Sequence, residues 1–216
     1  MIVPLNKMQE YYKGLYNKHG YSPDALGWHK GNQFLRFYQL TNQWNLNNSS
    51  ILDIGSGFGD FNKYLQVNNI SEYSYLGIDI LDEFIAEAKN QYPQNNVKFI
   101  KGDFLTTDII NNIDFSIASG TFNVKIEGVD CYDYIYENMK KMFDLSNKAI
   151  AIDLLSDRVD YFHEHNYNYD PIKILEMAYS LSKRVILNNS FFPFEFAIII
   201  FKDDSFEKEK MHFNYI

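Results

Sequence analysis

An aspartate and three glycines form the motif in this sequence with the clearest chemical meaning. Asp53 ends a short apolar run, and Gly55, Gly57 and Gly59 follow at alternate positions before a helical pattern begins. Because glycine has no Cβ, the chain can turn sharply there and bring its backbone N–H groups close to a ligand. The helix after the turn directs its positive end at the same place. This spacing predicts a site for a nucleotide-like cofactor at the end of the first strand of an open α/β sheet.

The glycine spacing distinguishes two kinds of cofactor. A dinucleotide fingerprint, G-x-G-x-x-G, requires glycine at the position that Asp60 occupies. The run from Asp53 to Gly59 instead has the form Asp-x-Gly-x-Gly-x-Gly. In this form it resembles the first motif of the class I S-adenosylmethionine-dependent methyltransferases. The alternative for the motif alone is a glycine-rich turn without a ligand.

Three β-rich runs follow the glycine motif, and each ends in residues that suit a cofactor. The runs are residues 73–80, 97–104 and 113–123. The first ends at Asp79, where an acid can accept hydrogen bonds from ribose hydroxyls. Each strand-end acid alone would more simply be a strand cap or a solvated loop residue. Their occurrence in this order favours one shared site.

The methyltransferase resemblance assigns the cofactor to these strand ends. It implies that Asp103 faces the adenine amino group and that Phe104 lines the ring. Arg36 is a candidate clamp for a carboxylate of the cofactor or of the acceptor, or else an ordinary cation on a helix surface. The predicted cofactor-binding residues are Asp53, Gly55, Ser56, Gly57, Asp79, Ile80, Asp103, Phe104, Ser119, Gly120 and Arg36.

The spacing of apolar residues predicts an α/β fold. Residues 5–19 and 130–145 have helical spacing, and Asp170-Pro171 begins a further helix. Residues 184–191 and 195–202 are predicted as two strands joined by a short turn. With the resemblance, this predicts a Rossmann-like, seven-stranded, mostly parallel sheet with an antiparallel C-terminal hairpin. Helices would cover both faces, and an N-terminal helical lid would precede the sheet.

Length and composition predict one methyltransferase domain over residues 1–216. A helical lid would span 1–48, the Rossmann-like core 49–204 and a polar tail 205–216. No Pro/Gly/Ser-rich linker divides the sequence, and no apolar run approaches the ~20 residues that a membrane helix requires. The lone cysteine, Cys131, cannot form an internal disulfide, so a reducing cytoplasm is the expected setting and no membrane partner is expected.

The net charge of −8 argues against a nucleic-acid partner. Proteins that grip phosphate backbones carry basic stripes, because counterion release drives their affinity. The fourth run also lacks the Asn/Asp-Pro-Pro-aromatic motif typical of methyltransferases that act on base amines, and has Ser119-Gly120-Thr121-Phe122 instead. We therefore expect a small-molecule acceptor.

Residues 156–169, after the fifth predicted strand, contain the candidate catalytic residues. His163 and His165 are the best candidates for a general base, because on extended chain they share one face while Glu164 points away. The His-x-His pattern is also a weaker candidate for a divalent metal site, but no further acid pattern completes a ligand set, and no metal is predicted. His29 is an alternative base.

The sequence thus predicts a methyltransferase that uses S-adenosylmethionine to methylate an O or N atom of a small molecule. Looser patterns in the flanking segments resemble a group of bacterial small-molecule methyltransferases, which brings no secure substrate. Two alternatives stay open: a non-catalytic S-adenosylmethionine-binding partner protein, and a NAD(P)-dependent oxidoreductase. Asp60 at the critical glycine position counts against the second.

Overall fold

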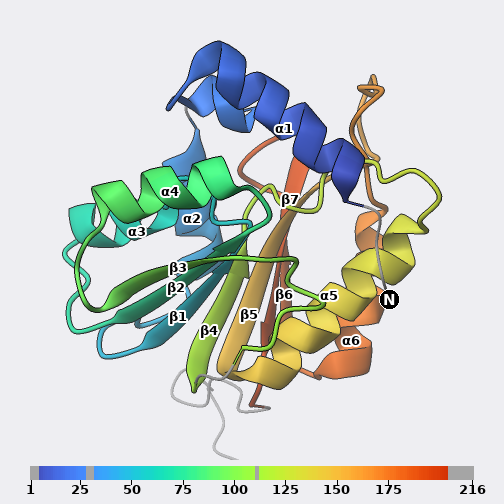
Figure 1. Cartoon of the computed structure of the whole chain (residues 1–216). Coiled ribbons are helices and arrows are strands. Elements are labelled where there is room, and N and C mark those ends of the chain that lie inside the picture. The colour runs from blue at the N-terminus through green and yellow to red at the C-terminus, as the bar shows by residue number, and fades with distance from the viewer. Residues whose placement is uncertain (1–4, 28–31, 110–111, 204–216) are drawn as a thin grey trace, which may run out of the picture.

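A mixed sheet lies at the centre of the molecule. The computed structural model describes residues 5–27, 32–109 and 112–203, and within them the sheet has seven strands in the order β3-β2-β1-β4-β5-β7-β6 (Figure 1). β7 is antiparallel to both of its neighbours, β5 and β6, while the other pairs are parallel. The strands are β1 (Ser50–Ile54), β2 (Ser74–Asp79), β3 (Val97–Lys101), β4 (Ile113–Ala118), β5 (Ser146–Leu155), β6 (Val185–Asn188) and β7 (Glu195–Phe201).

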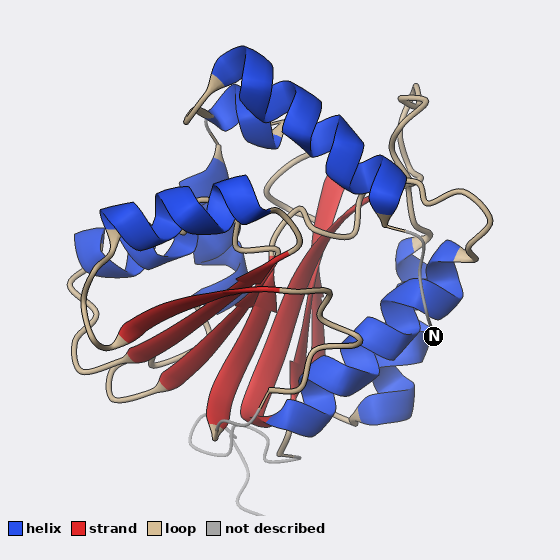
Figure 2. Ribbon diagram, in the orientation of Figure 1, coloured by secondary structure: helices blue, strands red, loops and turns tan. Residues whose placement is uncertain are grey.

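Helices cover both faces of the sheet (Figure 2). On one face α2, α3 and α4 bury Phe37, Leu65 and Ile85 in one apolar core, and on the other α5 and α6 bury Ile135 and Ile174 in a second. The central strands are therefore buried on both sides, which explains their nearly continuous apolar sequences. The helices are α1 (Asn6–His19), the 3₁₀ helix η1 (Pro23–Leu26), α2 (Gln33–Thr41), α3 (Asp60–Val67), α4 (Asp82–Gln91), α5 (Cys131–Leu145) and α6 (Pro171–Leu181).

The order of the strands locates the crevice where a ligand binds. β1 pairs with β2 on one side and with β4 on the other, so the chain reverses its direction of winding between β1 and β4. In open α/β sheets a ligand binds at this switch point, beyond the carboxyl ends of the strands. The glycine motif directly follows β1 and therefore lies at that position.

The predicted fold class is confirmed, and the local differences have local causes. The strand expected at 184–191 ends at Asn188, because the Asn188 side chain accepts hydrogen bonds from the backbone N–H and the hydroxyl of Ser190 and starts a turn. Helix α2 ends at Thr41, and Trp44 lies beyond it and stacks on Phe115. The predicted polar tail, 205–216, lies outside the described residues.

The N-terminal elements lie across the carboxyl ends of the strands (Figure 1). Tyr12 and Tyr16 of α1 make edge contacts with Phe84 of α4, and Tyr16 also contacts Phe58 beside the glycine motif. The Gln9 side chain donates a hydrogen bond to the carbonyl of Ile80, at the end of β2. Helix α1 therefore covers the crevice in the position expected of a lid. Among the described residues, no helix is both long enough and apolar enough to cross a membrane.

Candidate functional site: a cofactor pocket at the carboxyl edge of the sheet

The glycine motif forms a tight turn between β1 and α3. Gly55 and Gly57 have φ values of 69° and 53°, in the left-handed region that favours glycine. A Cβ on Gly55 would also overlap the Thr121 side chain, so glycine is needed there for space as well. The N–H groups of Gly55 and Ser56 donate to the carbonyl of Ile78, 2.8 and 3.0 Å away, and this holds the turn against β2.

Buried aspartates stand at the ends of the first two strands. Asp53 accepts a hydrogen bond from the Tyr75 hydroxyl. Asp79 accepts hydrogen bonds from the N–H groups of Gly57 (2.9 Å) and Leu81 (3.0 Å). Burial raises the pKa of Asp53 to about 7 and that of Asp79 to about 6, because a carboxylate loses its hydration inside the protein. Because it accepts the Gly57 N–H, Asp79 also fixes the glycine turn directly.

The ends of β3 and β4 complete the crevice. Beyond β3, Asp103 accepts a hydrogen bond from the Leu105 N–H (3.0 Å), and the Lys141 ammonium of α5 donates to the carbonyls of Phe104 and Thr107. Beyond β4, the Thr121 hydroxyl donates to the carbonyl of Ile54 at 2.8 Å. Both loops are thus held at fixed positions beside the glycine turn.

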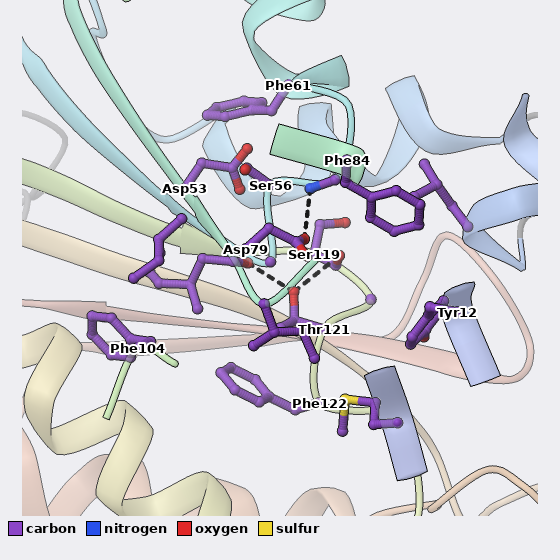
Figure 3. Close-up of a pocket in the computed structure, with 18 of the residues that line it drawn as sticks. Tyr12, Asp53, Ser56, Phe61, Asp79, Phe84, Phe104, Ser119, Thr121 and Phe122 are labelled. Carbon is purple, nitrogen blue, oxygen red and sulfur yellow. Dashed lines mark hydrogen bonds between the residues drawn. The ribbon is translucent and has the colours of Figure 1, made fainter. Parts of the chain in front are cut away.

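These segments enclose one pocket (Figure 3). Its empty space, including the part open to solvent, is about 940 Å³. Figure 3 shows Asp53, Asp79 and Ser119 on one side of this space, and Tyr12 from α1 on another. Among the described residues that line it, every charged side chain is acidic: Asp53, Asp60, Asp79 and Asp103.

All the predicted cofactor-binding residues except Arg36 line this pocket. Arg36 is buried and forms a two-pronged ion pair with Glu195 of β7, with Nε 2.7 Å from Oε2. Its guanidinium also lies 5.3 Å from the centre of the Phe192 ring. Arg36 is therefore not an ordinary cation on a helix surface, and its charge is engaged by a carboxylate of the protein.

The predicted catalytic histidines are not brought into the pocket. His163 and His165 are exposed on the loop after β5, where His163 contacts the Tyr161 ring and His165 lies 5.8 Å from the Tyr11 ring of α1. Their role stays a prediction. His29 lies outside the described residues. Within the described ranges, no group of three or more His, Cys, Asp or Glu side chains is placed to hold a metal ion.

Several pocket residues are absent from the sequence prediction, and most of them come from helices rather than from strand ends. The helical spacing of Met8 and Tyr12 indicated an amphipathic α1, but not that its apolar side would face a ligand. The lining residues that were not predicted as site residues include Leu5, Met8, Tyr12, Leu26, Gln33, Phe37, Asp60, Thr121, Phe122, Tyr134 and Asn138.

Comparison with known proteins agrees with this geometry. Residues 51–141, from β1 into α5, match the family model described as a methyltransferase domain. The chain is also 26% identical over 159 residues to Rv1506c of Mycobacterium tuberculosis, a protein named only provisionally as a methyltransferase. That alignment covers 71% of this chain and 93% of the relative.

Solved structures share the fold. Magnesium protoporphyrin IX methyltransferase from Synechocystis PCC 6803, with bound S-adenosylmethionine, superposes with a TM-score of 0.66 at 12% identity, covering 94% of this chain and 99% of that one. Human N-acetylserotonin methyltransferase, also with S-adenosylmethionine, gives a TM-score of 0.65 at 14% identity, covering 93% and 60%. A methyltransferase from Aquifex aeolicus gives 0.60 at 15%, covering 81% and 94%.

The fold and the glycine and acid residues at its carboxyl edge define a Rossmann-like cofactor-binding protein. With the family match and the relative, they show a class I S-adenosylmethionine-dependent methyltransferase, and S-adenosylmethionine is its cofactor. The residues present fit this cofactor. Buried acids can accept hydrogen bonds from ribose hydroxyls and attract a cation, and the hydroxyl oxygen of Ser56 is buried beside the pocket without a hydrogen-bond partner in the structure.

Replacing Asp79 tests its place in the cofactor site. We predict that Asp79→Ala weakens binding of S-adenosylhomocysteine by about 1–3 kcal/mol, the cost of losing a charged hydrogen-bond acceptor. Asp79→Asn keeps one acceptor oxygen for the Gly57 N–H and should lose less. Isothermal titration calorimetry of both variants measures the difference. Wild-type affinity in a folded Asp79→Ala protein would remove Asp79 from the site.

The raised pKa values predict a pH dependence of cofactor binding. Hydroxyl donors and cationic groups bind the ionised carboxylates, so bound cofactor lowers the pKa of Asp53 and Asp79 towards ordinary values. Affinity should then fall by about tenfold or more between about pH 8 and about pH 5, with protons released on binding near pH 6. Calorimetry in buffers of different ionisation enthalpy counts these protons. A constant affinity over this range would contradict the ionised-acid model.

Proposed function

We propose that this protein transfers the methyl group of S-adenosylmethionine to an O or N atom of a small-molecule acceptor. The observation that carries the proposal is the pocket itself: helix α1 of the same chain covers the cofactor crevice, with Leu5, Met8 and Tyr12 in its lining. A pocket covered by a helix of the same chain suits a small acceptor.

Methyl transfer requires the protein to align the reactants and exclude water, more than to take part in covalent catalysis. The cofactor supplies an activated methyl group on a sulfonium. The chain's part is to orient that group and the acceptor in line and to exclude water. Apolar and aromatic residues such as Phe61, Phe84 and Phe122 line the pocket and can exclude water, while the buried acids favour a positive charge.

The acidic lining of the pocket limits the chemical class of acceptor that we propose. The charged residues of the described lining are Asp53, Asp60, Asp79 and Asp103, so this part of the pocket offers no cationic side chain to pair with a phosphate or carboxylate acceptor. A neutral or cationic acceptor with a hydroxyl or amine is favoured. The same charge, with the net charge of −8, also disfavours a nucleic-acid backbone.

A non-catalytic S-adenosylmethionine-binding protein is the remaining alternative. The two functions differ in turnover. We predict that the protein incubated with methyl-labelled S-adenosylmethionine and a cell extract transfers label to the low-molecular-weight fraction, with matching formation of S-adenosylhomocysteine. A glycine-turn variant, Gly55→Val, is the control, because a side chain there overlaps Thr121. Label in protein or nucleic acid would overturn the small-molecule proposal, and no turnover would favour the binding protein.

The two loop histidines are proposed as general bases for a hydroxyl or amine acceptor. We predict that His163→Ala or His165→Ala lowers kcat at least tenfold and leaves S-adenosylhomocysteine affinity unchanged, since neither ring lines the cofactor pocket. Tyr161→Ala, on the same exposed loop, is the control for loop disturbance. Normal rates in both histidine variants with an identified acceptor would exclude the proposed base.

A further inference from the structure

A carboxylate outside the pocket holds one of the pocket's walls. Asp153 lies on β5, one residue beyond the Ala118–Ile152 register pair, and its side chain is 1% exposed. Its Oδ2 accepts a hydrogen bond from the Ser119 hydroxyl and its Oδ1 accepts one from the Gly120 N–H, both at 2.6 Å. Ser119 and Gly120 line the cofactor pocket, whereas Asp153 does not.

The turn that Asp153 holds is conformationally demanding. Gly120 has a φ of 69°, in the left-handed region, so the chain reverses sharply directly after β4. On the far side of the turn, the Thr121 hydroxyl is bonded to the Ile54 carbonyl, next to the first glycine of the motif. The turn is therefore fixed between Asp153 on one side and β1 on the other.

The surroundings of Asp153 argue against a role in stability alone. The charged groups that face it are Arg36 of α2 and Glu195 of β7, which are paired with each other. Two buried carboxylates thus share one guanidinium, and burial together with the Glu195 charge raises the pKa of Asp153 to about 7. An apolar side chain at this position would avoid that cost, as replacement of buried charges often does.

We propose that Asp153 is a positioning residue of the methyltransferase. It fixes the Ser119–Gly120 turn through two hydrogen bonds, and the turn in that shape presents the wall that S-adenosylmethionine contacts. Asp153 touches neither cofactor nor acceptor. The Arg36 charge favours the ionised form of Asp153, and Arg36 belongs to α2, whose Gln33 and Phe37 also line the pocket.

Two substitutions separate positioning from stability. Asp153→Val suits a strand and removes both acceptors, and we expect it to fold with a melting temperature near that of the wild type. Its affinity for S-adenosylhomocysteine should fall about tenfold or more, because the two donors of the turn lose their partner. In Asp153→Asn the amide oxygen can accept from the Gly120 N–H and the amide N–H can donate to the Ser119 oxygen. Affinity should return to within about threefold of the wild type.

The measurements are calorimetric titration with S-adenosylhomocysteine and thermal unfolding of each unliganded variant. Asp114→Asn is the matched control. It alters an acid at the amino end of β4 that accepts the Ser50 N–H, so it tests the same kind of bond far from the pocket. Its affinity should equal that of the wild type.

Three results would overturn the proposal. One is a folded Asp153→Val protein that binds S-adenosylhomocysteine within about twofold of the wild type. Another is an Asp153→Asn protein as weak as the valine variant, since charge rather than hydrogen-bond geometry would then matter. The third is failure of both Asp153→Val and Asp153→Ala to fold, because the carboxylate would then be required by the fold.

Discussion

Burial of carboxylates at the carboxyl edge of the sheet is the constraint on which the site depends. Asp53, Asp79 and Asp153 are each at most 8% exposed, and burial raises their pKa values to about 7, 6 and 7. An acid whose pKa is higher in the folded than in the unfolded state stabilises the fold at acidic pH, and this contribution is lost as pH rises through the folded pKa. Near neutral pH, ionisation of these buried acids therefore costs the unliganded protein free energy, and a cationic ligand can offset this cost. Buried carboxylates with raised pKa values are typical of functional sites.

The same carboxylates organise the backbone around the ligand. Asp79 holds the glycine turn through the Gly57 N–H, and Asp153 holds the turn after β4 through the Gly120 N–H. In both cases the partner is a backbone donor of a glycine, which a neutral apolar residue could not satisfy. The acids thus have two tasks, because they set the sign of the charge in the pocket and fix the loops that shape it. This explains why buried charge is retained in an otherwise apolar sheet.

Features that depend on neighbouring residues were predictable from the sequence. The helix at Asp82–Gln91 and the caps at Asp130 and Asp170 follow from short patterns, as do the strand-end acids, because a strand and the turn after it lie close together in the chain. The partner of Arg36 was not predictable. Glu195 is 159 positions away, and it reaches Arg36 only because β7 pairs with β5 in one register. Asp153 was missed for a similar reason, since inside an apolar strand nothing marks the turn that it serves.

Helix α1 is held less firmly than the strand ends that it covers. None of its residues is fully buried. Its ion pairs join Lys7 to the exposed Glu127 and Lys13 to the partly exposed Glu83, and pairs near the surface add little stability. The strand ends opposite are fixed by buried hydrogen bonds to Asp79 and Asp153. Displacing α1 exposes a few half-buried aromatic contacts, whereas displacing the turn after β1 or the turn after β4 leaves a buried carboxylate without its donors. The contacts of α1 over the pocket are therefore weaker than those that hold the strand ends, and movement of α1 costs less than movement of these turns.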